Sequence, residues 1–171
     1  AFSQAIESFW SVGANLESIK FAKKAIHLIN KHIDNFHINH KDENVMSDIL
    51  LGAHYSGKAI NISKTTAPHA LSYSITSFFG IPHGHAVGMT LGEFFIINEQ
   101  LASMNAVNCR DLSLHMLQMK SLRELLGWGD CISCNDKWKS IMKNLGLNMQ
   151  IKLNDGQEGV VNRLADSVNT E

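Results

Sequence analysis

The chain has 171 residues, of which 44% are hydrophobic and 18% are charged. This composition is ordinary for a globular protein, and the length is sufficient to bury a core as one domain, so a disordered chain is excluded. The 15 Lys and Arg residues nearly balance the 16 Asp and Glu residues. A formal charge of −1 gives no field that would draw the protein onto nucleic acid or an anionic membrane. We therefore expect small molecules or proteins as partners.

Residues that favour helices dominate the sequence. The chain has only 2 prolines and 8% aromatic residues, whereas Ala, Leu, Ile, Met and Lys are frequent, which predicts one all-α helical bundle over residues 1–171. No apolar run reaches the ~18 residues of a membrane span, and no signal-peptide pattern occurs, so we expect a cytoplasmic location. Residues 1–12 have the pattern of a helix without a capping residue before it, and we expect the chain to be part of a longer protein.

Three helices are predicted in the first third of the chain. Apolar residues three and four apart mark a helical face in residues 1–12, and Gly13 interrupts it. A long amphipathic helix is predicted over residues 16–36. The third helix is expected to be central in the bundle, with an apolar stripe formed by Met46, Ile49, Leu50, Ala53, Gly57 and Ile60. Small residues should let a neighbouring helix approach it closely, namely Gly52, Ala53, Ser56, Gly57 and Ala59.

Further helices are predicted after residue 110. Asp111 caps a helix over residues 111–126, and Gly127 ends it. Its inward face is expected to hold Leu112, His115, Met116, Met119, Leu122 and Leu126. Residues 135–145 and 156–168 are shorter helical candidates.

The cysteines give little support to a metal or disulfide framework. There are 3 of them, and an odd number argues against a secreted disulfide scaffold. The spacing of Cys131 and Cys134 could supply half of a zinc site, but no second pair follows it, and reduced structural thiols are the favoured interpretation.

The stretch of residues 64–100 carries most of the chemistry. Pro68 suits the first turn of a helix and places His69 at its start, with Tyr73 one turn later on the same face. Pro82 interrupts the chain, and His83 opens the next helix. The two histidines are either polar caps or a neutral imidazole pair that suits a divalent transition metal. For both to reach one ion, we expect the first helix to end early, because ten residues of helix would separate them by about 15 Å.

Two segments of the chain resemble a known family. His69-Ala70-Leu71-Ser72-Tyr73 and Pro82-His83-Gly84 resemble the HA-x-x-H and P-H-G motifs of the C-terminal helical domain of iron-containing (group III) alcohol dehydrogenases. Residues 1–8, AFSQAIES, resemble the family's Asp-Ala-Leu-x-His-Ala-Ile-Glu segment entered one residue late. The resemblance spans at least residues 1–98 and implies a bundle of the dehydroquinate synthase-like type, without the family's N-terminal dinucleotide-binding domain. Consistent with that absence, no nucleotide-phosphate glycine loop occurs in the chain.

The resemblance also implies a metal site. An aspartate and three histidines hold the metal in that family; two of the histidines match His69 and His83, and the first falls on Gln4, which becomes the third candidate ligand. The aspartate would lie immediately before Ala1. The family's further histidine, to which a proton-transfer role is ascribed, falls on Tyr73. His85 is a second candidate for proton transfer, because an unperturbed histidine titrates near neutrality.

The implied activity is that of an alcohol dehydrogenase or aldehyde reductase. Fe²⁺ or Zn²⁺ would polarise the carbonyl of a small aldehyde for hydride transfer from NAD(P)H, which the missing domain would mainly bind. The fragment alone is expected to be inactive, and the whole protein to form homo-oligomers. Gln4 and the run from Lys64 to His69 look most like the branch that reduces phosphonoacetaldehyde, where Lys64 would suit a phosphonate. Thr65 and Thr66 either line the cleft or cap the helix at His69, and capping is favoured.

Two other functions remain open from the sequence. A helical metal-dependent hydrolase could use the same histidines with an activated water, but it would need an acidic ligand within the chain. A noncatalytic helical interaction module would make every histidine structural.

Overall fold

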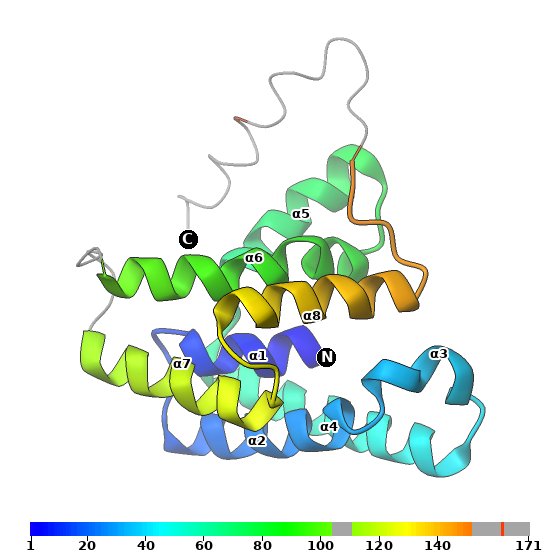
Figure 1. The fold of residues 1–171 in the computed structure, drawn as a ribbon, viewed down its shortest axis with the longest axis horizontal. Coiled ribbons are helices and arrows are strands. Elements are labelled where there is room, and N and C mark those ends of the chain that lie inside the picture. Colours follow the sequence, from blue (N-terminus) through cyan, green and yellow to red (C-terminus); the bar gives the residue numbers. More distant parts are fainter. Residues whose placement is uncertain (104–110, 152–161, 163–171) are drawn as a thin grey trace.

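A computed structural model describes residues 1–103, 111–151 and 162, and every regular element in this part of the chain is helical (Figure 1). The predicted all-α fold is therefore confirmed. Within the same residues, no helix is both long enough and apolar enough to cross a membrane. The elements in chain order are α1 (Phe2–Trp10), α2 (Leu16–Asn30), the 3-10 turn η1 (Ile33–Asn35), α3 (Phe36–Asn39), α4 (Glu43–Ser63), α5 (Ala67–Phe79), α6 (His83–Ser103), α7 (Leu112–Leu126) and α8 (Cys131–Asn144).

The first helix, α1, lies at the centre of the bundle. It packs against α2, α4, α6 and α7 (Figure 1). Seven of its nine residues are buried, and they include the polar residues Glu7 and Ser8. Because most of α1 is buried, its polar side chains lie inside the core, where hydrogen bonds hold them in fixed positions.

The second helix ends earlier than the sequence predicted. Its N-terminus is fixed by Asn15, whose side chain accepts hydrogen bonds from the backbone N–H groups of Glu17 and Ser18. At the other end α2 stops at Asn30, so the predicted helix over residues 16–36 was too long. The chain tightens there into 3-10 geometry, and the Asn30 side chain turns to donate to the Leu126 carbonyl at 3.0 Å. At its end α2 therefore contacts the last residue of α7, and the further turns that were predicted for α2 do not form.

The fourth helix buries a different face from the predicted one and lies at the outside of the bundle. Its buried residues are mostly small, namely Val45, Gly52, Ser56, Ala59 and Ser63. Leu50, expected in the core, is 64% exposed. Close approach decides this orientation: a Cβ placed on Gly52 would lie 2.6 Å from Ile29 Cγ1 of α2. A face that carried larger side chains could not approach α2 so closely.

The predicted helix over residues 111–126 is confirmed as α7. Asp111 accepts from the backbone N–H of Leu114, and Gly127 adopts the left-handed conformation at φ 68°. His115, Met119, Leu122 and Leu126 are buried, as expected, but Met116 is 45% exposed. The following helix, α8, begins four residues before the predicted start, because Asp130 caps it by accepting from the Ser133 N–H. Apart from residue 162, the helix predicted over residues 156–168 lies outside the described residues.

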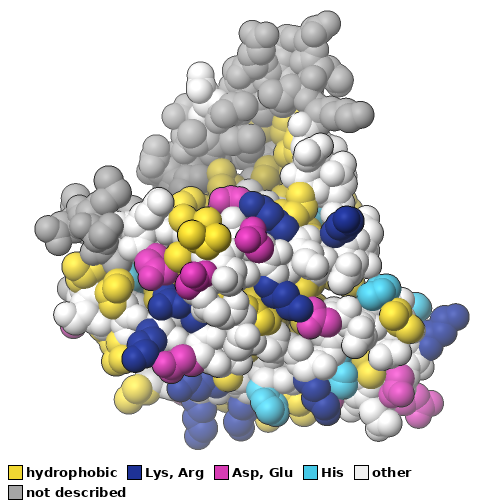
Figure 2. Space-filling model, viewed as in Figure 1, with side chains coloured by type: hydrophobic (Ala, Val, Ile, Leu, Met, Phe, Trp, Pro, Cys, Tyr) yellow, Lys and Arg dark blue, Asp and Glu magenta, His cyan; other side chains and the backbone are white. Residues whose placement is uncertain are grey.

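The surface agrees with a balanced charge. On the face shown in Figure 2, Lys and Arg side chains are interspersed with Asp and Glu side chains, and neither sign gathers into a patch. Ion pairs of this kind include Lys139 with Glu93 at 2.6 Å and Lys137 with Asp34 at 2.7 Å.

We expect Cys134 to resist thiol reagents in the folded protein. Its side chain is fully buried, and this burial raises the pKa of the thiol to about 12, so the reactive thiolate is scarce at mildly alkaline pH. Peptide mapping after treatment with a thiol reagent should find Cys134 unmodified until urea unfolds the chain. Rapid modification of Cys134 in the native protein would contradict its placement in the core.

Candidate metal centre

The two histidines of the sequence motif come together at the starts of α5 and α6. Their ring centroids lie 5.3 Å apart in an edge-on arrangement. His69 sits in the first turn of α5, where Pro68 also lies, and is buried. His83 is the first residue of α6 and is exposed.

The route that brings them together differs from the expected one. The first helix was predicted to end early, but α5 continues without a break to Phe79. Gly80 then adopts the left-handed conformation at φ 65°, and the connection returns beside the helix, so that His83 Nδ1 lies 3.1 Å from Ser72 Oγ. The prediction failed because it counted the full length of the helix as separation and neglected the returning connection and the reach of the side chains.

A buried carboxylate stands behind the first histidine. Glu7, on α1, is fully buried, and its Oε1 is hydrogen-bonded to His69 Nδ1. Its Oε2 accepts from the Thr66 N–H at 2.8 Å and from the Thr66 hydroxyl at 2.7 Å. Trp10 Nε1 donates to the same hydroxyl at 2.9 Å. Four residues thus form one hydrogen-bonded chain that joins α1 to the start of α5.

Two expectations change with this network. Thr66 occupies the position before α5, but its side chain makes no capping bond to that helix. Its hydroxyl is engaged by Glu7 instead, so the favoured capping role was wrong. Glu7 itself was not singled out as a site residue. The sequence did contain a signal, because Glu7 is acidic while positions 5, 6, 9 and 10 of the same helix are all apolar.

The second histidine is held by a serine and an aromatic ring. Ser72 Oγ donates to the His69 carbonyl at 2.6 Å and lies 3.1 Å from His83 Nδ1. The Tyr73 ring stacks on the His83 ring, with centroids 5.6 Å apart and planes at 24°. Desolvation, and next the neighbouring His69, lower the pKa of His83 below its ordinary value.

The remaining predicted residues lie as follows. Gln4 is half-buried on α1, one turn before Glu7, with its Oε1 3.3 Å from Ser56 Oγ. His85 Nε2 donates to the Asn148 carbonyl at 2.5 Å, in the loop that follows α8. Lys64 is exposed, and its Nζ donates to the Asn61 carbonyl at 3.1 Å. The structure therefore groups Tyr73 with the histidine pair and ties His85 to a different segment.

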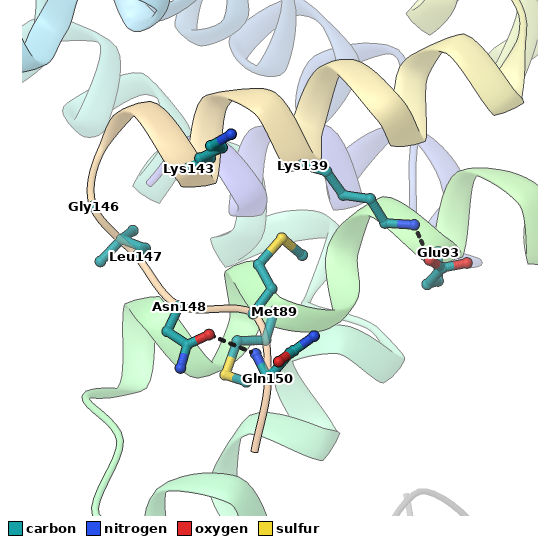
Figure 3. Close-up of a pocket in the computed structure, with 9 residues that line it drawn as sticks. Met89, Glu93, Lys139, Lys143, Gly146, Leu147, Asn148 and Gln150 are labelled. Carbon is teal, nitrogen blue, oxygen red and sulfur yellow. Dashed lines mark hydrogen bonds and ion pairs between the residues drawn. The ribbon is translucent and has the colours of Figure 1, made fainter. Parts of the chain in front are cut away.

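A cavity of about 790 Å³ lies next to the loop after α8 to which His85 is hydrogen-bonded (Figure 3). Helix α6 contributes Met89 and Glu93 to it, and helix α8 contributes Lys139 and Lys143. Residues 146–150 form the rest of the wall, and Asn148 Oδ1 accepts from the Gln150 N–H at 3.0 Å within it. Among the charged lining groups, Lys139 is already paired with Glu93.

The donor set at the histidine pair fits a transition metal in part. Two imidazoles are suitable ligands for iron or zinc, and a carboxylate bonded to the far nitrogen of a ligand histidine is a common supporting contact. In residues 1–103, 111–151 and 162, no group of three or more His, Cys, Asp or Glu side chains could hold a metal ion. His69 and His83 thus supply two ligands, and further ligands would have to be amide, water or groups outside these residues.

Comparisons with known proteins agree on one family. Residues 1–171 match the model of the Fe-containing alcohol dehydrogenase family, C-terminal. The chain is 33% identical over 111 residues to a phosphonoacetaldehyde reductase of Streptomyces viridochromogenes, and the matched region covers 65% of this chain and 27% of that protein. It is 28% identical over 116 residues to alcohol dehydrogenase 4 of Schizosaccharomyces pombe, covering 68% of this chain and 27% of that protein.

Solved structures give the same result for the fold. A sulfoacetaldehyde reductase from Bifidobacterium kashiwanohense, in complex with NAD⁺, superposes with a TM-score of 0.78 at 26% identity, covering 98% of this chain and 41% of that one. An iron-containing alcohol dehydrogenase from Thermotoga maritima superposes with a TM-score of 0.73 at 19% identity, covering 99% and 40%. The chain spans only about a quarter of the length of the curated relatives named above. It belongs to the iron-containing alcohol dehydrogenase family and corresponds to the C-terminal region of its members.

Proposed function

We propose that this chain is the metal-binding part of an NAD(P)H-dependent aldehyde reductase. The observation that carries the proposal is the distance of 5.3 Å between the ring centroids of His69 and His83, together with the buried carboxylate of Glu7 that is hydrogen-bonded to His69. The family supports the reaction type. The names of two relatives, a phosphonoacetaldehyde reductase and a sulfoacetaldehyde reductase, support a short aldehyde with an anionic group as the substrate class.

In this proposal His69 and His83 hold Fe²⁺ or Zn²⁺. Gln4 adds its amide oxygen, and a residue outside this chain completes the site. When bound, the metal supplies a Lewis acid at the carbonyl oxygen, which is worth several kcal/mol to the developing alkoxide.

The residues around the pair divide the remaining tasks. His69 is buried and fixed by Glu7, so it holds its position during the reaction. Tyr73 is 58% exposed, and its ring is stacked on the ring of His83. We assign Tyr73 Oη as the proton donor to the product oxygen, with His85 as the second candidate. The NAD(P)H site is assigned mainly to the part of the protein outside this chain, and the whole protein is proposed to be a cytoplasmic homo-oligomer.

The test uses the whole protein that contains this chain. Purified wild-type protein is expected to hold about one iron or zinc per chain and to oxidise NAD(P)H when given an aldehyde. His69→Ala and His83→Ala should each lose the metal and the activity, because removing one of so few ligands leaves no stable site. His54→Ala, at an exposed histidine of α4, is the matched control and should retain both.

Metal that stays bound in both ligand variants would refute the assignment of the pair. If the protein binds metal but reduces no aldehyde with either nicotinamide cofactor, the proposed reaction is refuted and the metal site is still supported.

A further inference from the structure

We propose that Glu7 and Ser72 are positioning residues that place the proton of both imidazoles on Nδ1, leaving the lone pair on Nε2 of each ring for a metal. This inference rests on the proposed function, since it concerns how the same pair is prepared. Neither residue contacts the reacting atoms. Both act through the histidine that they hold.

The direction of the hydrogen bonds at Glu7 is fixed by its neighbours. The Trp10 indole can only donate, so it donates to Thr66 Oγ1, and the Thr66 hydroxyl must then give its own proton to Glu7 Oε2. The Thr66 N–H donates to the same oxygen. A carboxylate that already receives two donors on one oxygen acts as an acceptor on the other. His69 Nδ1 therefore carries the proton that it shares with Oε1.

The direction of the hydrogen bonds at Ser72 follows from the same reasoning. Ser72 has one hydroxyl proton, and its Oγ lies 2.6 Å from the His69 carbonyl oxygen, which can only accept. The proton is used there, so Ser72 offers only a lone pair to His83 Nδ1 at 3.1 Å. His83 Nδ1 must then carry a proton as well. Two unrelated partners impose the same tautomer on two rings.

This tautomer is the one that a metal needs at Nε2. Neutral imidazole in water favours the proton on Nε2, which would block that atom as a ligand. A hydrogen bond at one ring nitrogen decides which nitrogen of a histidine is protonated. Partners of this kind also fix the ring orientation, and their loss typically weakens metal affinity about 10- to 100-fold.

Glu7→Gln is expected to reverse the tautomer of His69. The two donors of Thr66 would hold the carbonyl oxygen of the glutamine, which turns its NH₂ group toward His69 Nδ1. An NH₂ donor there requires Nδ1 to accept, and the ring proton moves to Nε2. Ser72→Ala removes the acceptor from His83 and should release the tautomer of that ring alone. Ser18→Ala, at a buried and hydrogen-bonded serine of α2, is the control.

The test has two readouts in the whole protein. In metal-free protein labelled with ¹⁵N at histidine, wild type should show both rings protonated at Nδ1. Glu7→Gln should change only the His69 signals, and Ser72→Ala only those of His83. In zinc titrations, each of the two variants should bind about 10- to 100-fold more weakly, while Ser18→Ala binds as wild type does.

The outcomes separate this inference from the proposed function. If zinc binds wild type through the pair and both variants bind it equally well, the positioning role is refuted. If the metal-free rings of wild type carry the proton on Nε2, it is refuted whatever the zinc result. If wild type binds neither zinc nor Fe²⁺, the proposed function is refuted, while the tautomer signals still decide which proton positions Glu7 and Ser72 impose. Should Glu7→Gln fail to fold, Ser72→Ala carries both readouts for His83.

Discussion

Phe95→Ala is expected to lower the free energy of unfolding by about 3–5 kcal/mol. Phe95 is completely buried, and its ring meets Trp10 edge-on at 5.4 Å and Trp128 at 6.5 Å. It therefore joins α6 to α1 and to the turn after α7. Helices surround the vacated space on several sides and cannot all move into it, so the cavity would persist. Such a loss is a large share of the roughly 5–15 kcal/mol that holds a typical domain folded.

Chemical denaturation of the two proteins under the same conditions measures this loss. Leu50→Ala is the control, because Leu50 is a large hydrophobic residue that was expected in the core from the sequence but is 64% exposed. Its cost should stay within about 0.5 kcal/mol. Equal costs at Phe95 and Leu50 would contradict the orientation of α4 described above.

Gly52→Ala and Gly57→Ala are expected to change stability in opposite directions. Both glycines lie inside α4, so the gain from helix propensity is the same for each. A Cβ at Gly57 would have nothing within 4 Å, and this substitution should stabilise the protein by about 0.4–1 kcal/mol. A Cβ at Gly52 would lie 2.6 Å from Ile29 Cγ1 and 3.4 Å from the Ala25 carbonyl oxygen. Overpacking of that kind costs about 1–3 kcal/mol.

The difference between the two unfolding free energies is the quantity to measure, because it isolates the contact of α4 with α2. A clear loss at Gly52 beside a gain at Gly57 would support the close approach. Two gains of similar size would show that α2 and α4 are farther apart than described.

Periodic apolar residues and capping residues were sufficient to predict most of the helices. Asp111 and Gly127 bound α7 as expected, since each acts through its own local backbone. For α4 the same reasoning was right only in part. The close approach of a neighbouring helix that was expected at the small residues is confirmed at Gly52, which lies against α2. The inward face that was assigned by hydrophobicity was wrong, because Leu50 is exposed and mostly small residues are buried.

The candidate site, like the fold, could be predicted from the sequence only in part. His69, Tyr73 and His83 could be found from motifs because they lie close together in the sequence, and their roles remain predictions. Glu7 could not be assigned in this way, because its partner is 62 positions away and the pairing exists only once α1 has docked. The end of the helix before the fold-back was also mispredicted. Instead of ending early, α5 continues to Phe79, and the chain turns back at the left-handed Gly80.

The buried position of Glu7 also has a consequence for the order of folding. His83 and Ser72 are 11 positions apart within one helical hairpin, so their contact closes a short loop. The contact of Glu7 with His69 closes a loop of 62 positions, which costs more chain entropy and forms only with the rest of the bundle. The imidazoles can thus approach each other within a local hairpin, while the carboxylate that orders His69 requires a long-range contact between α1 and α5. Tight metal uptake would then mark a chain whose tertiary structure is already assembled.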